Sequence, residues 1–194
     1  MEQLQVAQMH YLKWMMHSPK STPNALTLLE LGVLPIMDEI MVRKLSFLRH
    51  ILILDESDPV SKMYTELKKY PGEPNWYNEI VKFLLELDLD FDEEKIKRMS
   101  KHRWKRIVKR RVTLHALNNL RNQCSQLKKV TNIDQYQKLK RQEYLDKLPP
   151  DAARIFFQLK VGIYDLKSFR PFQYDDITCR LCKKGEETLD HVVN

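Results

Sequence analysis

The chain has 194 residues, of which 43% are hydrophobic and 30% charged, and its net charge is +7, so the composition is that of a folded but charge-rich protein of one large or two small domains. No apolar run approaches the roughly 18 residues that a membrane span needs, and the N-terminus lacks the basic segment and clean apolar core of a signal peptide. Three cysteines, an odd number, argue against a disulfide framework and favour a reducing, intracellular location.

Helical spacing of apolar residues runs through most of the chain, and only four glycines interrupt it. Pro23 fits the first position of a helix capped by Thr22, and Gly32 fits its left-handed end. Residues suited to cap later helices are Asp92, Ser100 and Asp134. The expected helices cover residues 2–17, 23–32, 35–54, 59–69, 75–88, 100–124, 135–147 and 151–164, with a short helix after Asp92. In the last of them the residues expected to be buried are Ile155, Phe156, Leu159 and Ile163. No alternating apolar pattern is long enough for a sheet, so we predict an all-α, irregular multi-helix domain that ends in a small knuckle.

Charge is distributed very unevenly along the chain. Residues 1–94 carry 9 basic and 16 acidic residues, a net charge of −7, whereas residues 95–148 carry 17 and 3, a net charge of +14. The remaining 46 residues carry seven of each. We therefore expect an acidic helical region over 1–94, a basic helical region over 95–168 and a terminal knuckle over 169–194. So basic a middle region predicts a polyanionic partner, most simply nucleic acid.

The basic charge is concentrated in the stretch KIKRMSKHRWKRIVKRR, where ten of seventeen residues are Lys or Arg. On a helical wheel, one side carries Trp104, Ile107, Val108, Arg111 and His115. The opposite side carries Arg103, Lys105, Arg106, Lys109 and Arg110. A solvated helix face and a nuclear-import signal are the alternatives for such a run. Because the cations are sorted by face, we predict that these five contact phosphates, which fix position without reading sequence. Trp104 lies on the apolar side, which favours core packing over base stacking.

The tail carries a pattern of metal ligands. Cys179 and Cys182 form a C-x2-C pair, and His191 follows after eight residues, an arrangement that can direct two thiolates and an imidazole at one zinc ion with Zn–S distances near ~2.3 Å. Tetrahedral zinc takes a fourth ligand, and a cysteine directly after Asn194 would complete a C-x2-C-x8-H-x3-C knuckle. We therefore expect a truncated, incomplete zinc site. The alternatives are a chance cysteine pair and a three-ligand catalytic zinc; Cys124, inside a predicted helix, is not assigned to the site.

Several motifs occur in a recognisable order. In chain order they are the run STPNALTLLELGVLP, the stretch VRKLSFLRHIL, a helix with Asn75, Trp76 and Val81, a leucine-rich acidic segment, a lysine-rich helix, a helix with Gln142, Tyr144 and Leu145, and the Cys/His ending. Over roughly residues 18–194 this order resembles the region after the palm in reverse transcriptases of non-LTR (LINE-type) retrotransposons. The resemblance implies a thumb-like and connecting helical region that grips template and nascent duplex, followed by a CCHC knuckle that contacts nucleic acid. The palm, the fingers and the final knuckle cysteine of that family do not occur in this sequence.

One short segment imitates a polymerase site. Gln173, Tyr174, Asp175 and Asp176 look like the paired aspartates of a reverse transcriptase. That motif needs a spacer between the aromatic residue and the aspartates, and supporting strands with a third carboxylate to hold two metal ions. Neither is evident, so we predict a solvated turn.

The function expected from the sequence is nucleic-acid binding without catalysis. The chain resembles the non-catalytic part of an RNA-directed DNA polymerase, which would hold RNA or DNA by the phosphate backbone, bind zinc in its knuckle, need no membrane or small-molecule substrate, and act in the nucleus. The alternative is a degenerate or recruited helical protein–protein interaction domain with no nucleic-acid role, in which the acidic region folds onto the basic one. The two differ in whether the basic helix face is free.

Overall fold

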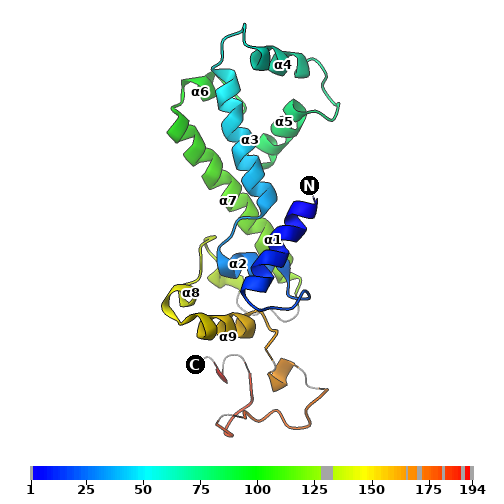
Figure 1. Cartoon of the computed structure of the whole chain (residues 1–194), viewed down its shortest axis with the longest axis vertical. Helices are drawn as coiled ribbons and strands as arrows, with labels where there is room; N and C mark the ends of the chain where they lie inside the picture. Colours follow the sequence, from blue (N-terminus) through cyan, green and yellow to red (C-terminus); the bar gives the residue numbers. More distant parts are fainter. Residues whose placement is uncertain are drawn as a thin grey trace. The chain divides into compact units, whose positions relative to one another are not determined.

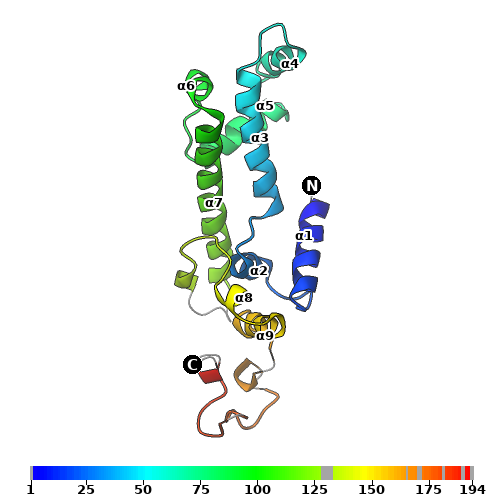
Figure 2. The ribbon, with the colours of Figure 1, turned by 60° about the vertical axis from the view of Figure 1, so that its left-hand side comes forward.

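The fold is all-α, as predicted. The computed structural model describes residues 2–127, 133–164, 166–169, 172–180, 182–188 and 191–192. These residues form nine α-helices, two 3-10 helices and no strand (Figure 1 and Figure 2), with one isolated antiparallel bridge between Thr178 and Glu186. None of the described helices combines the length and the apolar character that crossing a membrane requires.

The helices pack into two compact units. The central unit, Leu34–Ala116, contains α3 (Ile36–Leu52), α4 (Pro59–Leu67), α5 (Trp76–Glu86), α6 (Glu93–Arg98) and the first part of α7 (Lys101–Ser125). The terminal unit, Met1–Val33 with Leu117–Asn194, contains α1 (Glu2–Met15), α2 (Asn24–Leu31), the end of α7, the 3-10 helix Ile133–Gln135, α8 (Tyr144–Lys147), α9 (Pro150–Lys160) and the 3-10 helix Lys167–Phe169. These units are defined by packing. The three regions 1–94, 95–168 and 169–194 are defined by charge and expected function, and they remain a prediction.

The core of the central unit is built from the apolar stripes of α3, α5 and α7. Fully buried residues include Leu45, Leu48, Ile80, Leu84 and Val108. The helix starts are fixed by side-chain caps that the sequence supplies at the right places. Asp58, Asn75, Asp92 and Ser100 accept hydrogen bonds from the backbone N–H groups of Val60, Asn78, Lys95 and Arg103. The predicted caps at residues 92 and 100 are therefore confirmed, and each satisfies an N–H group that has no partner inside its helix.

The core of the terminal unit surrounds α2, which is buried from Ala25 to its last residue, Leu31. Gly32 caps the end of this helix and has the left-handed φ of 62° that the sequence predicts. Glycine is required there for a second reason, because a Cβ atom would collide with the backbone of Lys140 and Arg141. The start of α2 differs from the prediction: the helix begins at Asn24, and the Thr22 hydroxyl donates to the Pro19 carbonyl at 2.8 Å instead of capping it.

The predicted helix over 135–147, with Asp134 as its cap, is wrong. Only the 3-10 helix and the one-turn α8 form there, because two tyrosines converge on one buried carboxylate. Tyr136 and Tyr144 both donate their hydroxyl hydrogens to Glu30 of α2. In a continuous helix, residues eight positions apart lie ~12 Å apart along the axis, which is too far for both phenols to reach one carboxylate. Asp134 instead pairs with Arg121 at 3.0 Å.

The last predicted helix is shorter than expected. α9 ends at Lys160, and Gly162 has a positive φ of 71°. Ile155, expected in the core, is 46% exposed, whereas Phe157 is fully buried. Leu159 is buried as expected, but the buried side of α9 also follows Ala153 and Phe157, four residues apart, which the expected stripe did not include.

Candidate nucleic-acid interface and metal site

The first part of α7 is fixed to the central unit along one side. Trp104, Val108 and Val112 follow one another at four-residue spacing, and all three are buried. The indole N–H of Trp104 donates to the backbone carbonyl of Leu45 in α3 at 2.7 Å, inside the core. Trp104 is therefore a core residue, as its place on the apolar side predicts. Because the buried side is anchored, the opposite side of the helix is held in a fixed position.

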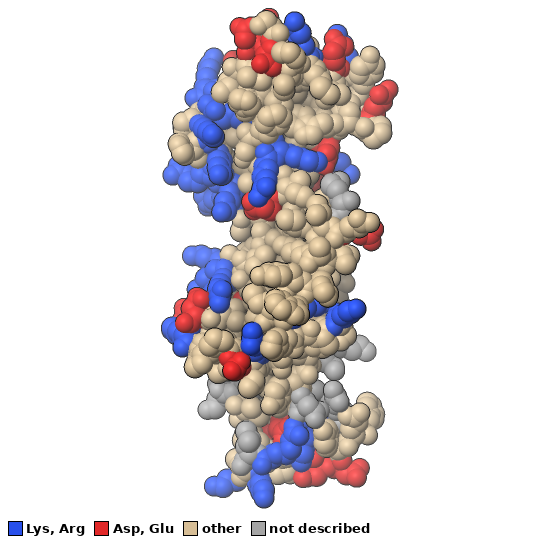
Figure 3. Space-filling model, in the orientation of Figure 1, with Lys and Arg blue, Asp and Glu red and all other residues tan. Residues whose placement is uncertain are grey.

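The predicted basic face of α7 is open to solvent. Its five members are all exposed: Arg103, Lys105, Arg106, Lys109 and Arg110. Within the part of the chain that the structure describes, none of their side chains forms an ion pair or a hydrogen bond. Figure 3 shows Lys and Arg side chains gathered on the side of the central unit where α6 and α7 lie in Figure 1. We call these five residues the basic face.

The acidic segment next to α7 pairs with cations that flank the basic face. The pairs are Arg111 with Asp88 at 3.8 Å, Lys95 with Asp90 at 3.4 Å and Lys97 with Glu94 at 2.8 Å. Such exposed pairs stabilise the fold little, but they reduce the local positive charge on both sides of the basic face. Lys101 is a further exposed cation that the helical wheel did not select. Its signal is the four-residue spacing that it shares with Lys105 and Lys109.

The tail brings the three predicted metal ligands together. The ligand atoms of Cys179, Cys182 and His191 all lie within 4.8 Å of one another, and Cys182 Sγ is 2.9 Å from His191 Nε2. Tetrahedral zinc with bonds of ~2.0–2.3 Å separates its ligand atoms by about 3.5–3.8 Å. Two sulfurs and an imidazole nitrogen are also the donor types that zinc prefers. The group can therefore hold one metal ion, and the described residues supply three of its ligands.

Hydrogen bonds within the chain hold the backbone around the two cysteines. Cys179 N donates to the Gly185 carbonyl at 2.7 Å, and Lys183 N donates to the Cys179 carbonyl at 2.9 Å. Lys184 N lies 3.4 Å from Cys182 Sγ, in the position of a donor that stabilises a thiolate. Gly185 matters through its missing side chain, because a Cβ atom there would lie 3.2 Å from Cε1 of His191. The imidazole therefore packs directly on the glycine.

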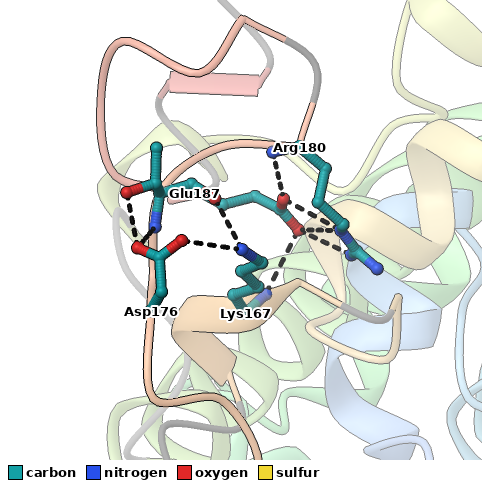
Figure 4. Close-up of polar contacts among 5 residues, drawn as sticks. Lys167, Asp176, Arg180 and Glu187 are labelled. Carbon is teal, nitrogen blue, oxygen red and sulfur yellow. Dashed lines mark hydrogen bonds and ion pairs between the residues drawn. The ribbon is translucent and has the colours of Figure 1, made fainter.

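A buried carboxylate holds this loop to the segment before it, and the sequence pattern did not reveal it. Glu187 is 3% exposed and accepts hydrogen bonds from the Arg180 backbone N–H at 2.8 Å, from the Arg180 guanidinium at 2.6 Å, and from the Lys167 backbone N–H at 3.2 Å (Figure 4). The hydrogen bonds from the Arg180 side chain lower the pKa of Glu187 to about 2, although burial alone would raise it. Its only sequence signal is an acidic residue eight positions after Cys179.

Two other groups named by the sequence are separate from these sites. Cys124 is buried in the core of the terminal unit, and burial raises the pKa of its thiol to about 11, so it remains a protonated core residue. Asp175 and Asp176 lie on an exposed turn. The Asp176 carboxylate accepts hydrogen bonds from the Thr178 hydroxyl and, at 2.8 Å, from the Thr178 backbone N–H, and these two bonds, the hydroxyl bond first, lower its pKa. The expected solvated turn is what the structure has.

Comparisons with protein-family models, curated proteins and solved structures gave no match to this chain. What the chain can bind is therefore inferred from the basic face and from the Cys/His group.

Proposed function

We propose that this chain is the nucleic-acid-binding, thumb-like and knuckle part of a non-LTR retrotransposon reverse transcriptase. On this proposal it grips the phosphate backbone of a template or duplex in the nucleus and performs no polymerase chemistry of its own. The observation that carries the proposal is the basic face: five exposed cations without counter-ions among the described residues, on a helix whose other side is anchored in a core.

The dimensions of the basic face suit a phosphate backbone. Arg103 and Arg110 are seven residues apart, which is ~10 Å along a helix axis and equals the axial rise of about three nucleotides in one strand. Arginine adds planar, bidentate contacts to phosphate, and lysine adds a mobile point charge. Contacts to phosphates do not read the edges of the bases, so binding is expected to depend on charge and little on sequence.

The Cys/His group supports the same proposal as a second contact. Zinc held by Cys179, Cys182 and His191 would order the loop that carries three exposed cations, Arg180, Lys183 and Lys184. Structural zinc sites stabilise small loops that could not fold by burial alone. Here the ion has a structural role, and the cations around it meet the nucleic acid.

The test is the salt dependence of binding to a generic 20-base-pair RNA–DNA duplex, measured by fluorescence anisotropy. The five phosphate contacts of the basic face alone contribute about −4 to −5 to the log–log slope, so affinity should fall at least about 500-fold between 50 and 200 mM salt. Replacing Lys105, Arg106, Lys109 and Arg110 with Ala should make the slope shallower by about 4 and weaken binding to unrelated sequences alike.

A matched control removes the same charge elsewhere. The fourfold variant of Lys62, Lys138, Lys140 and Lys147 to Ala changes four exposed residues outside α7 and should largely keep the slope. If both variants lose the same amount of duplex affinity, net charge and not the basic face explains the binding. A flat salt dependence of the unaltered chain, or no binding at 50 mM salt, would contradict the proposal and favour the helical protein–protein interaction domain.

A further inference from the structure

A groove beside α1 has features of a ligand site that the basic face and the Cys/His group do not use. It has a volume of about 580 Å³ and lies between α1 and the segment that follows it, within the terminal unit. Its apolar lining comes from Val6, Met9, Trp14 and Pro19. A volume of this size and a mostly apolar lining with a few polar groups are typical of small-molecule sites.

The decisive residue in the groove is a buried lysine. Lys13 is only 8% exposed, yet among the described residues its ammonium has a single hydrogen-bond acceptor, the Lys20 carbonyl at 2.7 Å. Within the described residues no carboxylate lies at ion-pair distance from it, and the groove lining contains no acidic residue. Burial without a counter-ion lowers the pKa of Lys13. A buried cation is stabilised by pairing, so the groove lacks a negative charge at this point.

The walls of the groove are held in place by hydrogen bonds. Two donors of α9 reach the end of α1 and the residues after it. Arg154 donates to the Met15 carbonyl at 3.2 Å, and Gln158 donates to the His17 carbonyl at 3.0 Å. The Ser18 hydroxyl donates to the Lys13 carbonyl at 3.3 Å. The groove is therefore formed without a ligand, which lowers the cost of binding one.

The groove also leaves apolar side chains uncovered, just as it leaves Lys13 without a counter-charge. Trp14 is 68% exposed and Val6 is 64% exposed, although both line the groove. Covering such large apolar side chains releases water and favours binding. A ligand made of phosphates alone would leave these apolar side chains exposed to water. A neutral hydrocarbon would cover them but leave Lys13 without a counter-charge.

We propose that the α1 groove binds a small organic anion with an apolar body, whose negative group pairs with Lys13 and whose body covers Trp14 and Val6. The groove shares no residue with the basic face, so its test does not depend on nucleic-acid binding.

The experiment uses a matched pair of fluorescent probes on the full chain. They are 8-anilinonaphthalene-1-sulfonate, which carries one anion, and N-phenyl-1-naphthylamine, the same body without it. Lys13→Met keeps the length and the apolar stem of the side chain, and should weaken the anionic probe at least about tenfold while changing the neutral probe less than twofold. Trp14→Ala should weaken both probes. Lys62→Met, at an exposed position on α4, should change neither.

Competition on the unaltered chain gives an independent answer, even if Lys13→Met does not fold. Octanoate should displace N-phenyl-1-naphthylamine at a concentration at least tenfold lower than 1-octanol, because only octanoate supplies the counter-charge. Equal displacement, equal loss of both probes in Lys13→Met, or no binding of the anionic probe would each overturn the proposal.

Discussion

The buried Glu30 carboxylate gives the sharpest test of how the terminal unit is held together. Glu30 is fully buried in α2 and accepts hydrogen bonds from the phenols of Tyr136 and Tyr144, the second at 2.7 Å, while its backbone carbonyl accepts from Gln142 N at 3.2 Å. No cation pairs with it among the described residues. These bonds connect α2 to a segment more than a hundred positions later that has little regular structure of its own.

Replacing Tyr136 with Phe removes one donor and leaves the ring, so the cost comes from the hydrogen bond and not from a cavity. A hydrogen bond to a charged group contributes about 1.5–3 kcal/mol, so the free energy of unfolding of the terminal unit should fall by about 2 kcal/mol. With a urea slope of ~1–3 kcal/mol/M, this moves the unfolding midpoint down by about 1 M. Far-UV circular dichroism during urea titration measures the shift.

The control is Tyr11→Phe, which removes a phenol from an exposed position on α1 in the same unit and should change the midpoint by less than about 0.2 M. If Tyr136→Phe costs no more than Tyr11→Phe, the buried carboxylate does not organise the segment as described.

The same network predicts a loss of stability at alkaline pH. Burial, followed by the charge of Glu30, holds the pKa values of Tyr136 and Tyr144 well above the ordinary value of 10.0. Because the folded pKa is the higher one, this stabilisation is complete below pH 10 and is lost as the pH rises above it. Unfolding midpoints measured from pH 8 to pH 11 should fall less steeply in Tyr136→Phe than in the unaltered chain; parallel curves would contradict the assignment.

Three further changes test the two sites. Cys182→Ser removes one of the two thiolates and should lower the thiolate-to-metal absorption of Co²⁺ by at least about half, whereas Cys124→Ala should retain it because that thiol is buried and protonated; equal spectra from both variants would contradict the site. Gly185→Ala should weaken Co²⁺ binding about tenfold, since the new Cβ displaces the imidazole of His191, and unchanged affinity in a Co²⁺ titration would show that the ring is free to move. Trp104→Phe should lower the thermal stability of the central unit by about 1–3 kcal/mol while leaving duplex affinity unchanged at 20 °C; reduced affinity of the folded variant would indicate base stacking.

The regular helices could be predicted from the sequence because their determinants are local. The caps at Asp92 and Ser100 and the left-handed Gly32 each act within a few residues of their own position. The basic face follows from the same local arithmetic: once α7 is a helix with Trp104 on its buried side, the exposure of Lys105 and Arg106 follows.

The segment from residue 133 to residue 148 could not be predicted in this way, because its structure depends on distant partners. Apolar spacing and Asp134 favour a helix there, but Glu30 draws Tyr136 and Tyr144 to one point, and tertiary hydrogen bonds outweigh a weak local preference. The register of α9 has the same origin, since the core around α2 selects Phe157 over Ile155.

The Cys/His group combines both kinds of determinant. Local spacing placed Cys179, Cys182 and His191 together as predicted, yet Glu187, which shapes the loop, gave no recognisable pattern. Its carboxylate bonds Arg180 N directly after the first cysteine, so the loop has a scaffold that does not consist of metal bonds. Removing a metal ion bound to this group with a chelator should therefore loosen the loop locally and leave the basic face on α7 intact. Contributions of the two sites to duplex affinity are then expected to be nearly additive, because no described ligand or cation is shared between them.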